Sequence, residues 1–366
     1  MASLPLIAEL LGECPQLLGV AMEAAGVAKA VENAGLTFLE IRGVSDAADL
    51  SKDDAGHSYA ANAAAAFMAG LLRAHPVRSA GERAKRELAG TPKGRALCIL
   101  RAQSLRAIDA REILAALPSD LGSRELETVG LDFTDLMTRD RRLTDPEAAA
   151  RRLADSEGAL LEALSRRDER DYAYHGLVHI PLAALAGFIV SDRQKVRLFD
   201  FDPAPGSESW SWPEPGGSYP ALEIAGVPSA QVAGVGDVIV RMSVSYPAGV
   251  DASRAAAPDD LLEIDLQVPA PERGTVRSEE QVRAYGSAFR KVLDAVAGHV
   301  PGCARVHLFY AGPVSLAFHL GQQISENIHP PVVVWNYRRE EDYAWGVDLR
   351  AACRDEACLL KAAAAR

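Results

Sequence analysis

The sequence lacks the long apolar runs and the excess of basic residues that mark membrane proteins and general nucleic-acid binders. No apolar run reaches the roughly 18 residues that a membrane span needs. The N-terminus also lacks the basic segment and apolar core of a signal peptide. Lysine and arginine number 39 against 50 acidic residues, a formal net charge of -11. This charge argues against direct binding to long nucleic acid but permits a small anion in a locally basic pocket. We expect a cytoplasmic protein without a membrane segment.

Motifs for metals and disulfides are also missing. The five cysteines are scattered and lack the spacing of a metal site or a disulfide scaffold: Cys14, Cys98, Cys303, Cys353 and Cys358. We therefore expect free thiols in a reducing compartment, no bound metal and no cofactor.

Composition and length predict a globular protein of more than one domain. Apolar residues make up 48% and charged residues 24% of 366 residues, which is ordinary globular composition. The stretch 76–94 is polar, basic and bracketed by prolines and glycines, which is typical of a linker. We predict an N-terminal segment at 1–75, this linker, a main domain at 95–352 and a C-terminal tail at 353–366.

Periodicity along the main domain predicts strands that alternate with helices. Strands are expected at 96–100, 126–133, 196–201, 237–244, 261–268, 305–310 and 332–337. Helices are expected at 109–117, 145–164, 180–190, 279–298 and 315–324. This alternation indicates an α/β fold with parallel sheets, arranged from residue 95 onward as two tandem, divergent units. The N-terminal segment predicts helices at 22–31 and 58–72 and a strand at 38–41.

Two similar stretches occupy corresponding places in the two units. Residues 174–183 read YHGLVHIPLA and residues 306–318 read VHLFYAGPVSLAF. Each is a strand-like run that ends in a proline and continues into an apolar helix. The spacing places a helix N-terminus at the carboxyl end of a strand, where backbone N–H groups and the helix dipole receive phosphate.

These stretches resemble the signature of the SAVED family, and further segments agree with it in order. The agreeing segments are Arg101–Leu105, Phe199–Asp200 with the pair Trp210 and Trp212, Arg241–Tyr246, Gly321–Gln322, and Val334–Tyr337 with Tyr343. The resemblance implies two fused CARF-like, Rossmann-type units. It also implies a cyclic di-, tri- or tetranucleotide as ligand, a role in bacterial anti-phage defence (CBASS or type III CRISPR signalling), and homo-oligomers on ligand binding.

The resemblance also suggests site residues. Gln103 and Ser104 would donate to phosphate or ribose. His175 and His179 either face the ligand or are satisfied core residues. Trp210 and Trp212 either stack on bases or pack a loop on the sheet.

Two further groups complete the expected site. Ala311, Pro313 and Ser315 would line the second strand-to-helix turn, where the backbone comes close to the ligand. Arg101 and Arg241 are the cations expected to bind phosphate, with a solvated surface position as the alternative for each.

The N-terminal segment resembles the end of a nucleoside phosphorylase or nucleosidase. In that family, the glutamate in the position of Glu23 contacts ribose, and the aspartate in the position of Asp46 protonates the purine. The family's earlier sheet and phosphate loop precede this region, whereas 21 residues precede Met22 here. We therefore expect a truncated or degenerate effector segment, and an alanine-rich helical cap is the structural alternative. A signal-activated nucleosidase is the alternative function, and slow cleavage of the ligand by the sensor is a third.

Overall fold

The computed structural model describes Ile41 and residues 57–73, 95–166, 170–202, 209–210, 212, 218–258 and 260–362. The chain divides into two compact units, residues 1–92 and 93–366. In the first unit, α3 (His57–Arg73) is rich in alanine and exposes Tyr59 and Phe67. This helix confirms the one expected at 58–72. The helix expected at 22–31 and, apart from Ile41, the strand expected at 38–41 lie outside the described residues.

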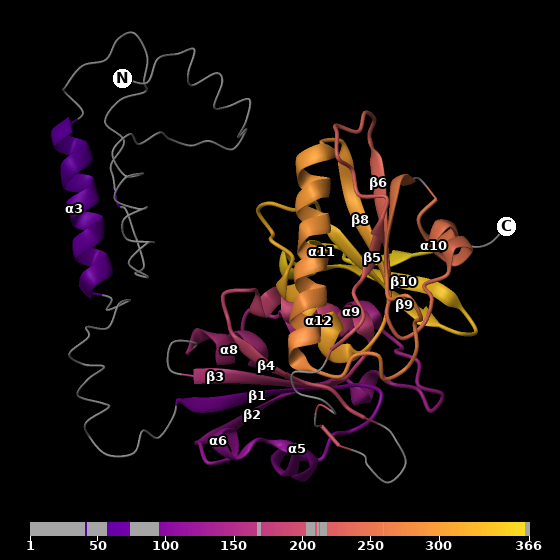
Figure 1. Ribbon diagram of the computed structural model, residues 1–366. Helices are drawn as coiled ribbons and strands as arrows, with labels where there is room; N and C mark the ends of the chain where they lie inside the picture. The colour runs from indigo at the N-terminus through magenta and orange to yellow at the C-terminus, as the bar shows by residue number, and fades with distance from the viewer. Residues whose placement is uncertain are drawn as a thin grey trace. The chain divides into compact units, whose positions relative to one another are not determined.

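The second unit opens with a parallel sheet of four strands, in the order β2-β1-β3-β4 (Figure 1). The strands are β1 (Ala96–Gln103), β2 (Leu126–Asp132), β3 (Arg170–Leu177) and β4 (Val196–Phe199). Leu97 and Ile99 pack on one face of β1, and Cys98 and Leu100 pack on the other. A parallel sheet that is apolar on both sides requires helices on both faces.

Five helices belong to this sheet. They are α5 (Ala110–Ala116), α6 (Ser119–Gly122), α7 (Pro146–Ala154), α8 (Ala159–Ser165) and α9 (Ile180–Val190), with a short 3-10 turn at Thr134–Leu136. The single helix expected at 145–164 is wrong, because the chain turns between α7 and α8. Gly158 is the N-cap of α8, and a Cβ there would lie 2.9 Å from the carbonyl oxygen of Asp155, so the turn favours glycine.

A second sheet has seven strands in the order β11-β10-β9-β8-β6-β7-β5. The strands are β5 (Glu223–Ala225), β6 (Gly236–Ser243), β7 (Asp260–Gln267), β8 (Cys303–Ala311), β9 (Val332–Arg338), β10 (Asp342–Asp348) and β11 (Leu359–Lys361). The four central strands are parallel, as expected, whereas β5, β10 and β11 add antiparallel edges. The segment after Cys353, expected as a tail, therefore contains a paired strand.

The helices of the second sheet are α10 (Val250–Ala256), α11 (Glu279–His299), α12 (Val314–Gln322) and α13 (Leu349–Cys353). In α11, Ser278 caps the first turn by accepting the backbone N–H of Gln281. Phe289 and Leu293 lie on its buried face, one turn apart. Within the described part of the chain, no helix is long and apolar enough to cross a membrane.

The two sheets repeat one design. The order β2-β1-β3-β4 matches β7-β6-β8-β9, and in each a helix, α9 or α12, follows the third of these strands in the sequence. The match extends to single hydrogen bonds. Ser104 N–H donates to Leu177 O at 3.0 Å, and Val244 N–H donates to Ala311 O at 3.0 Å, each just past its central strand. The expected tandem repeat is confirmed.

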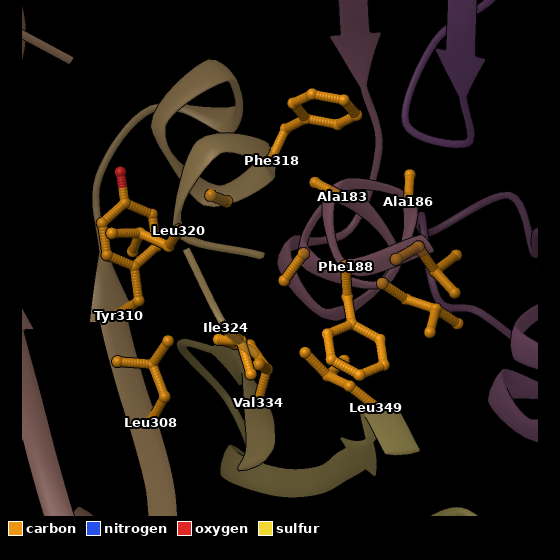
Figure 2. Close-up of a cluster of buried hydrophobic side chains, with 14 of the residues drawn as sticks. Ala183, Ala186, Phe188, Leu308, Tyr310, Phe318, Leu320, Ile324, Val334 and Leu349 are labelled. Atoms are coloured by element: carbon orange, nitrogen blue, oxygen red, sulfur yellow. The ribbon is translucent and has the colours of Figure 1, made fainter. Parts of the chain in front are cut away.

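Helices α9 and α12 lie between the two sheets (Figure 1). A single core cluster holds Leu100 of the first sheet, Val240 of the second and most of both helices. The outer face of the first sheet packs in a separate cluster with α5, and the outer face of the second packs with α10. Figure 2 shows the inner cluster, to which α9 contributes Phe188, α12 Leu320, β8 Leu308 and β9 Val334.

The two inner helices cross where their backbones touch. A Cβ at Gly187 of α9 would lie 1.8 Å from the carbonyl oxygen of Phe318 in α12. Reciprocally, a Cβ at Gly321 would lie 2.0 Å from the carbonyl oxygen of Ala184. Only glycine permits this approach at either position. The crossing therefore fixes both helix N-termini relative to the carboxyl ends of the strands.

Candidate functional site

The N-termini of α9 and α12 both begin at carboxyl ends of strands and carry no side-chain cap of their own. The cap residues are His179 and Pro313, and neither makes a capping side-chain hydrogen bond. By contrast, Asp145 and Ser278 cap α7 and α11 through their side chains. The helix dipole at these N-termini suits an anionic or hydrogen-bond-accepting group. In α9, Pro181 has no N–H and Leu182 N–H already donates to His179 O at 3.0 Å, which leaves Ile180 as the first-turn residue whose N–H can serve such a group.

At the α9 end, Ser104 and His179 form a buried pair. The backbone N–H of His179 donates to Ser104 Oγ at 3.2 Å, and the same oxygen lies 2.8 Å from His179 Nδ1. The hydroxyl has one proton and two acceptor lone pairs, so its contact with Nδ1 forms with either tautomer of the neutral ring. Burial, and then the charge of Arg338, lower the pKa of His179 to about 4. The ring is therefore a neutral donor at physiological pH.

Residues of the second sheet complete the α9 end. Trp345 of β10 lies 6.1 Å from the ring of His179, measured between ring centroids. Arg338, the last residue of β9, pairs with Asp140 at 3.3 Å and with Glu340 at 3.0 Å. Its Nη1 atom is buried and has no hydrogen-bond partner among the described residues. This end therefore combines an open helix N-terminus, a cation and an aromatic ring drawn from both halves.

The residue near the N-terminus of α12 is an acid, whereas the residue near the N-terminus of α9 is the cation Arg338. Asp200 follows β4 and interacts with Ser315 in the first turn of α12, although the buried Ser315 hydroxyl has no hydrogen-bond partner among the described residues. Burial raises the pKa of Asp200 to about 6, although the contact with Ser315 acts in the opposite direction. A carboxylate of this chain therefore lies near the N-terminus of α12.

Two tyrosines mark the strand ends beside this carboxylate. Tyr174 and Tyr310 each fold over the glycine two residues later, so that a Cβ at Gly176 or Gly312 would lie 2.3 Å from the respective hydroxyl. The Tyr310 hydroxyl donates to the carbonyl oxygen of Pro313 at 2.9 Å. The Tyr174 hydroxyl is fully buried and has no partner in the described part of the chain. The negative charge of Asp200 contributes to the raised pKa of both tyrosines.

Gln103 is held beside the first-sheet edge of the site. Its side-chain oxygen accepts the backbone N–H of Ile108 at 2.9 Å, and its amide nitrogen donates to Asp132 at 2.6 Å. Gln103 therefore orders the turn after β1, next to Ser104, and has both ends of its amide occupied.

Three other predicted residues lie on the outer face of the first sheet, away from α9 and α12. His175 is fully buried, stacks on Phe199 at 4.5 Å and meets the edge of Trp210 at 5.1 Å. Burial lowers the pKa of His175 to about 3, so the ring is neutral. Trp210 is also fully buried. Arg101 pairs in register with His175 and donates to the carbonyl oxygen of Ile108 at 3.3 Å.

Arg241 occupies the matching position in the second sheet and is held by an ion-pair network. Its side chain is 3% exposed and contacts Asp265 at 2.7 Å and Glu263 at 2.5 Å. It also donates to Ser253 Oγ at 3.1 Å. The hydrogen bonds to both carboxylates raise the pKa of Arg241 although burial lowers it. Its charge is therefore already balanced within the chain.

The remaining predicted residues are distributed between these regions. Trp212 donates from Nε1 to the carbonyl oxygen of Leu198 at 2.7 Å, which fixes the indole against β4. Ala311 and Pro313 lie at the α12 end beside Ser315. Glu23 and Asp46 lie outside the described residues. Among the described residues, no group of three or more His, Cys, Asp or Glu side chains could hold a metal ion.

Sequence reasoning missed three residues of this site as site residues. Arg338 and Trp345 lie in an antiparallel hairpin, β9–β10, whereas the expectation was built on strand-to-helix turns. Asp200 belongs to a quoted motif, but its role depends on contact with a helix that is distant in the sequence. A polar residue at the end of a buried strand would have been the available signal.

A comparison with family models matches residues 156–349 to SAVED, described as the SMODS-associated and fused to various effectors sensor domain. The match covers more than half of the chain. The chain belongs to the SAVED family.

Solved structures that match this SAVED chain include Cap4 SAVED/CARF-domain containing receptors. The receptor of Acinetobacter baumannii with the cyclic trinucleotide 3'3'3'-cAAA is 13% identical, with a TM-score of 0.39, over 66% of this chain and 49% of that chain. The receptor of Moraxella osloensis is 12% identical, with a TM-score of 0.38, over 66% and 47% of the two chains. The SAVED chain thus spans about half the length of these structures. A search of curated proteins gave no significant match.

Proposed function

We propose that this SAVED chain is the sensor of a bacterial anti-phage defence system and binds a cyclic oligonucleotide across its two halves. The observation that carries the proposal is the α9 end, where an uncapped helix N-terminus, His179 and Arg338 meet. A phosphate diester is an acceptor that this arrangement of N–H donors and cation suits. Ala311, Pro313 and Ser315, at the N-terminus of α12, would line the other side of the ligand site.

Trp345 supplies a place for a base. Its indole lies beside His179 and is only partly buried, so a base could stack on the part that stays exposed. Trp210, for which base stacking was one of two expectations, is fully buried on the outer face of the first sheet. A phosphate at the α9 N-terminus with its base on Trp345 would bridge the two sheets, which suits a ligand of at least two nucleotides.

The direct test is a binding titration of the full chain with cyclic di-, tri- and tetranucleotides, by calorimetry and thermal shift. A ligand at 100 times its dissociation constant should stabilise the fold by about 2.7 kcal/mol. Arg338→Gln should weaken binding about tenfold or more, since it removes a charged hydrogen bond to phosphate. Arg142→Gln is the matched control, because Arg142 pairs with the same acids, Asp140 and Glu341. Equal losses in both variants, or no binding by wild type, would contradict the proposal.

We further propose that residues 1–75 are a phosphorylase-like effector segment whose assembly or activity the ligand controls, with 76–94 as the linker and 95–352 as the sensor. Support comes from the resemblance around Glu23 and Asp46 and from the division of the chain near residue 92. Sedimentation of the full chain with and without ligand tests it. Unchanged assembly and no release of free base from nucleosides would remove this part while leaving the sensor intact.

A further inference from the structure

The strand β2 forms one edge of the first sheet, whereas the corresponding strand of the second sheet, β7, is covered (Figure 1). In the second half, β5 pairs antiparallel with β7 along the three residues that begin at Asp265. The repeat matches Asp265 with Gly130 of β2, because each lies opposite the equivalent arginine, Arg241 or Arg101. In the part of the chain that the structure describes, no strand pairs with the outer edge of β2.

The backbone of β2 uses alternate residues to pair with β1. The N–H of Leu97 donates to the carbonyl oxygen of Glu125 at 2.8 Å, and the N–H of Phe133 donates to that of Gln103 at 2.9 Å. Successive residues of a strand direct their backbone groups to opposite sides. The odd-numbered residues of β2 therefore bond to β1, and the even-numbered residues form the outer edge.

The free backbone groups of this edge belong to Leu126, Thr128 and Gly130. At Asp132, the last even-numbered residue, the carbonyl oxygen already accepts a hydrogen bond from Arg152 Nη1 at 3.1 Å. The N–H and C=O groups of the other three residues have no partner among the described residues. Thr128 and Gly130 are exposed, and none of the three is charged or a proline, the residues that commonly protect a free edge. The edge is therefore open to another strand.

We propose that β2 pairs antiparallel with β2 of a second copy of this chain and joins the two four-stranded sheets into one. Two identical edges related by a two-fold axis meet in this direction. The axis would pass beside Thr128, so that Thr128 pairs with its counterpart and Leu126 pairs with the second copy's Gly130. This register uses all the free groups, about six hydrogen bonds, because each of the three residues offers one donor and one acceptor.

The charges along β2 support this register over its neighbours. Glu127 would lie opposite Val129 of the second copy, and no acid of β2 would face another acid. A register centred on Glu127 would instead place this carboxylate opposite its counterpart, which is unfavourable. A register centred on Val129 would need the carbonyl oxygen of Asp132, which Arg152 already occupies. The pairing does not involve the ligand, so it stands or falls independently of the sensor function.

Sedimentation of the full chain over a range of concentrations tests the pairing. Wild type should form a dimer whose population rises with concentration. Thr128→Pro should raise the dissociation constant of this dimer about tenfold or more, because it removes the central N–H donor from both copies. This N–H does not bond to β1, so the strand tolerates proline there. Thr128→Val keeps the N–H and should dimerise like wild type. A monomeric wild type, or equal dimerisation of the two variants, would overturn the proposal.

Hydrogen exchange of the wild-type chain decides the question if Thr128→Pro does not fold. The amides of Leu126, Thr128 and Gly130 should exchange at least about tenfold more slowly where the dimer forms than in dilute protein. The amide of Val235, an exposed residue of the second half, is the control and should exchange equally under both conditions. A dimer whose formation leaves exchange along β2 unchanged would have its interface elsewhere, which would also overturn the proposal.

Discussion

Gly187 and Gly321 occupy the same place in two helices, each seven residues after its helix begins, and each lies against the backbone of the other helix. Their hypothetical Cβ atoms would lie 1.8 Å and 2.0 Å from carbonyl oxygens of the facing helix. The contact joins the two halves at the centre of the inner core.

This contact predicts that alanine is not tolerated at either glycine. Gly187→Ala and Gly321→Ala should each reduce the free energy of unfolding by roughly 3 kcal/mol, because the added methyl forces the helices apart. Chemical denaturation of each variant measures the loss.

Gly298 offers a matched control in the long helix α11. A Cβ there would meet nothing within 4 Å. Gly298→Ala should therefore be neutral or should stabilise the protein by up to about 1 kcal/mol through helix propensity. Similar losses in the free energy of unfolding at all three glycines would contradict the close backbone contact between α9 and α12.

The ion-pair network of Arg241 predicts a structural role for this arginine. Arg241→Met should reduce the free energy of unfolding by roughly 3 kcal/mol, near the lower end for a broken buried pair, since Asp265 is 43% exposed. Arg101→Met should cost less, because Arg101 has no carboxylate partner in the described part of the chain. Ligand affinity of the folded Arg241→Met protein should equal that of wild type. A large drop in affinity would restore the phosphate role first expected for Arg241.

The pair Ser104 and His179 predicts an effect on both stability and binding. Ser104→Ala leaves the backbone N–H and Nδ1 of His179 without their shared partner, which should cost about 1–3 kcal/mol. Ligand binding should weaken as well, because the imidazole would lose its fixed orientation. Ser123→Ala, at an exposed serine of the α6–β2 turn, is the control and should change neither quantity. Calorimetry and denaturation of the same preparations report both effects.

Asp200 predicts a pH dependence of stability with a defined sign. Its pKa is raised from 3.8 to about 6 in the folded state, so the folded protein binds the proton more tightly than the unfolded chain. Its stabilising contribution is therefore present below pH 4 and is lost as the pH rises through 6. Asp200→Asn should be more stable than wild type at pH 7.5 by up to roughly 3 kcal/mol, and this difference should shrink at pH 4.5. A constant difference between the two pH values would contradict this titration.

Much of the fold could be predicted from the sequence because its central elements carry strong local signals. Helix α9 is almost wholly apolar with a proline in its first turn, α12 is mostly apolar and follows Pro313, and the central strands are short apolar runs. The edge strands of the second sheet lack such local sequence signals. All three residues of β5 are exposed, and its place is set only by pairing with β7. The turn that separates α7 from α8 also depends on one glycine within an otherwise helical pattern.

The site was harder to predict than the fold, because composition does not reveal to which face of a sheet a side chain points or which residues on neighbouring strands pair. Trp210 and His175 have the right chemistry for a base, but the alternation along β3 and the packing beside β4 turn them outward. Ser104 and His179 could be found because they follow the ends of strands directly. Arg338 and Asp200 act on helices that begin far away in the sequence, so only the tertiary structure reveals their positions.

The antiparallel strands β5 and β11 limit how the second sheet can pair with another chain. They occupy the two outer edges of the seven-stranded sheet, so the parallel strands within it present no free backbone edge to another chain. Each edge strand has only three residues, Glu223–Ala225 and Leu359–Lys361, and offers little backbone for sheet extension. Self-association through this sheet would therefore have to use side chains rather than continuous strand pairing.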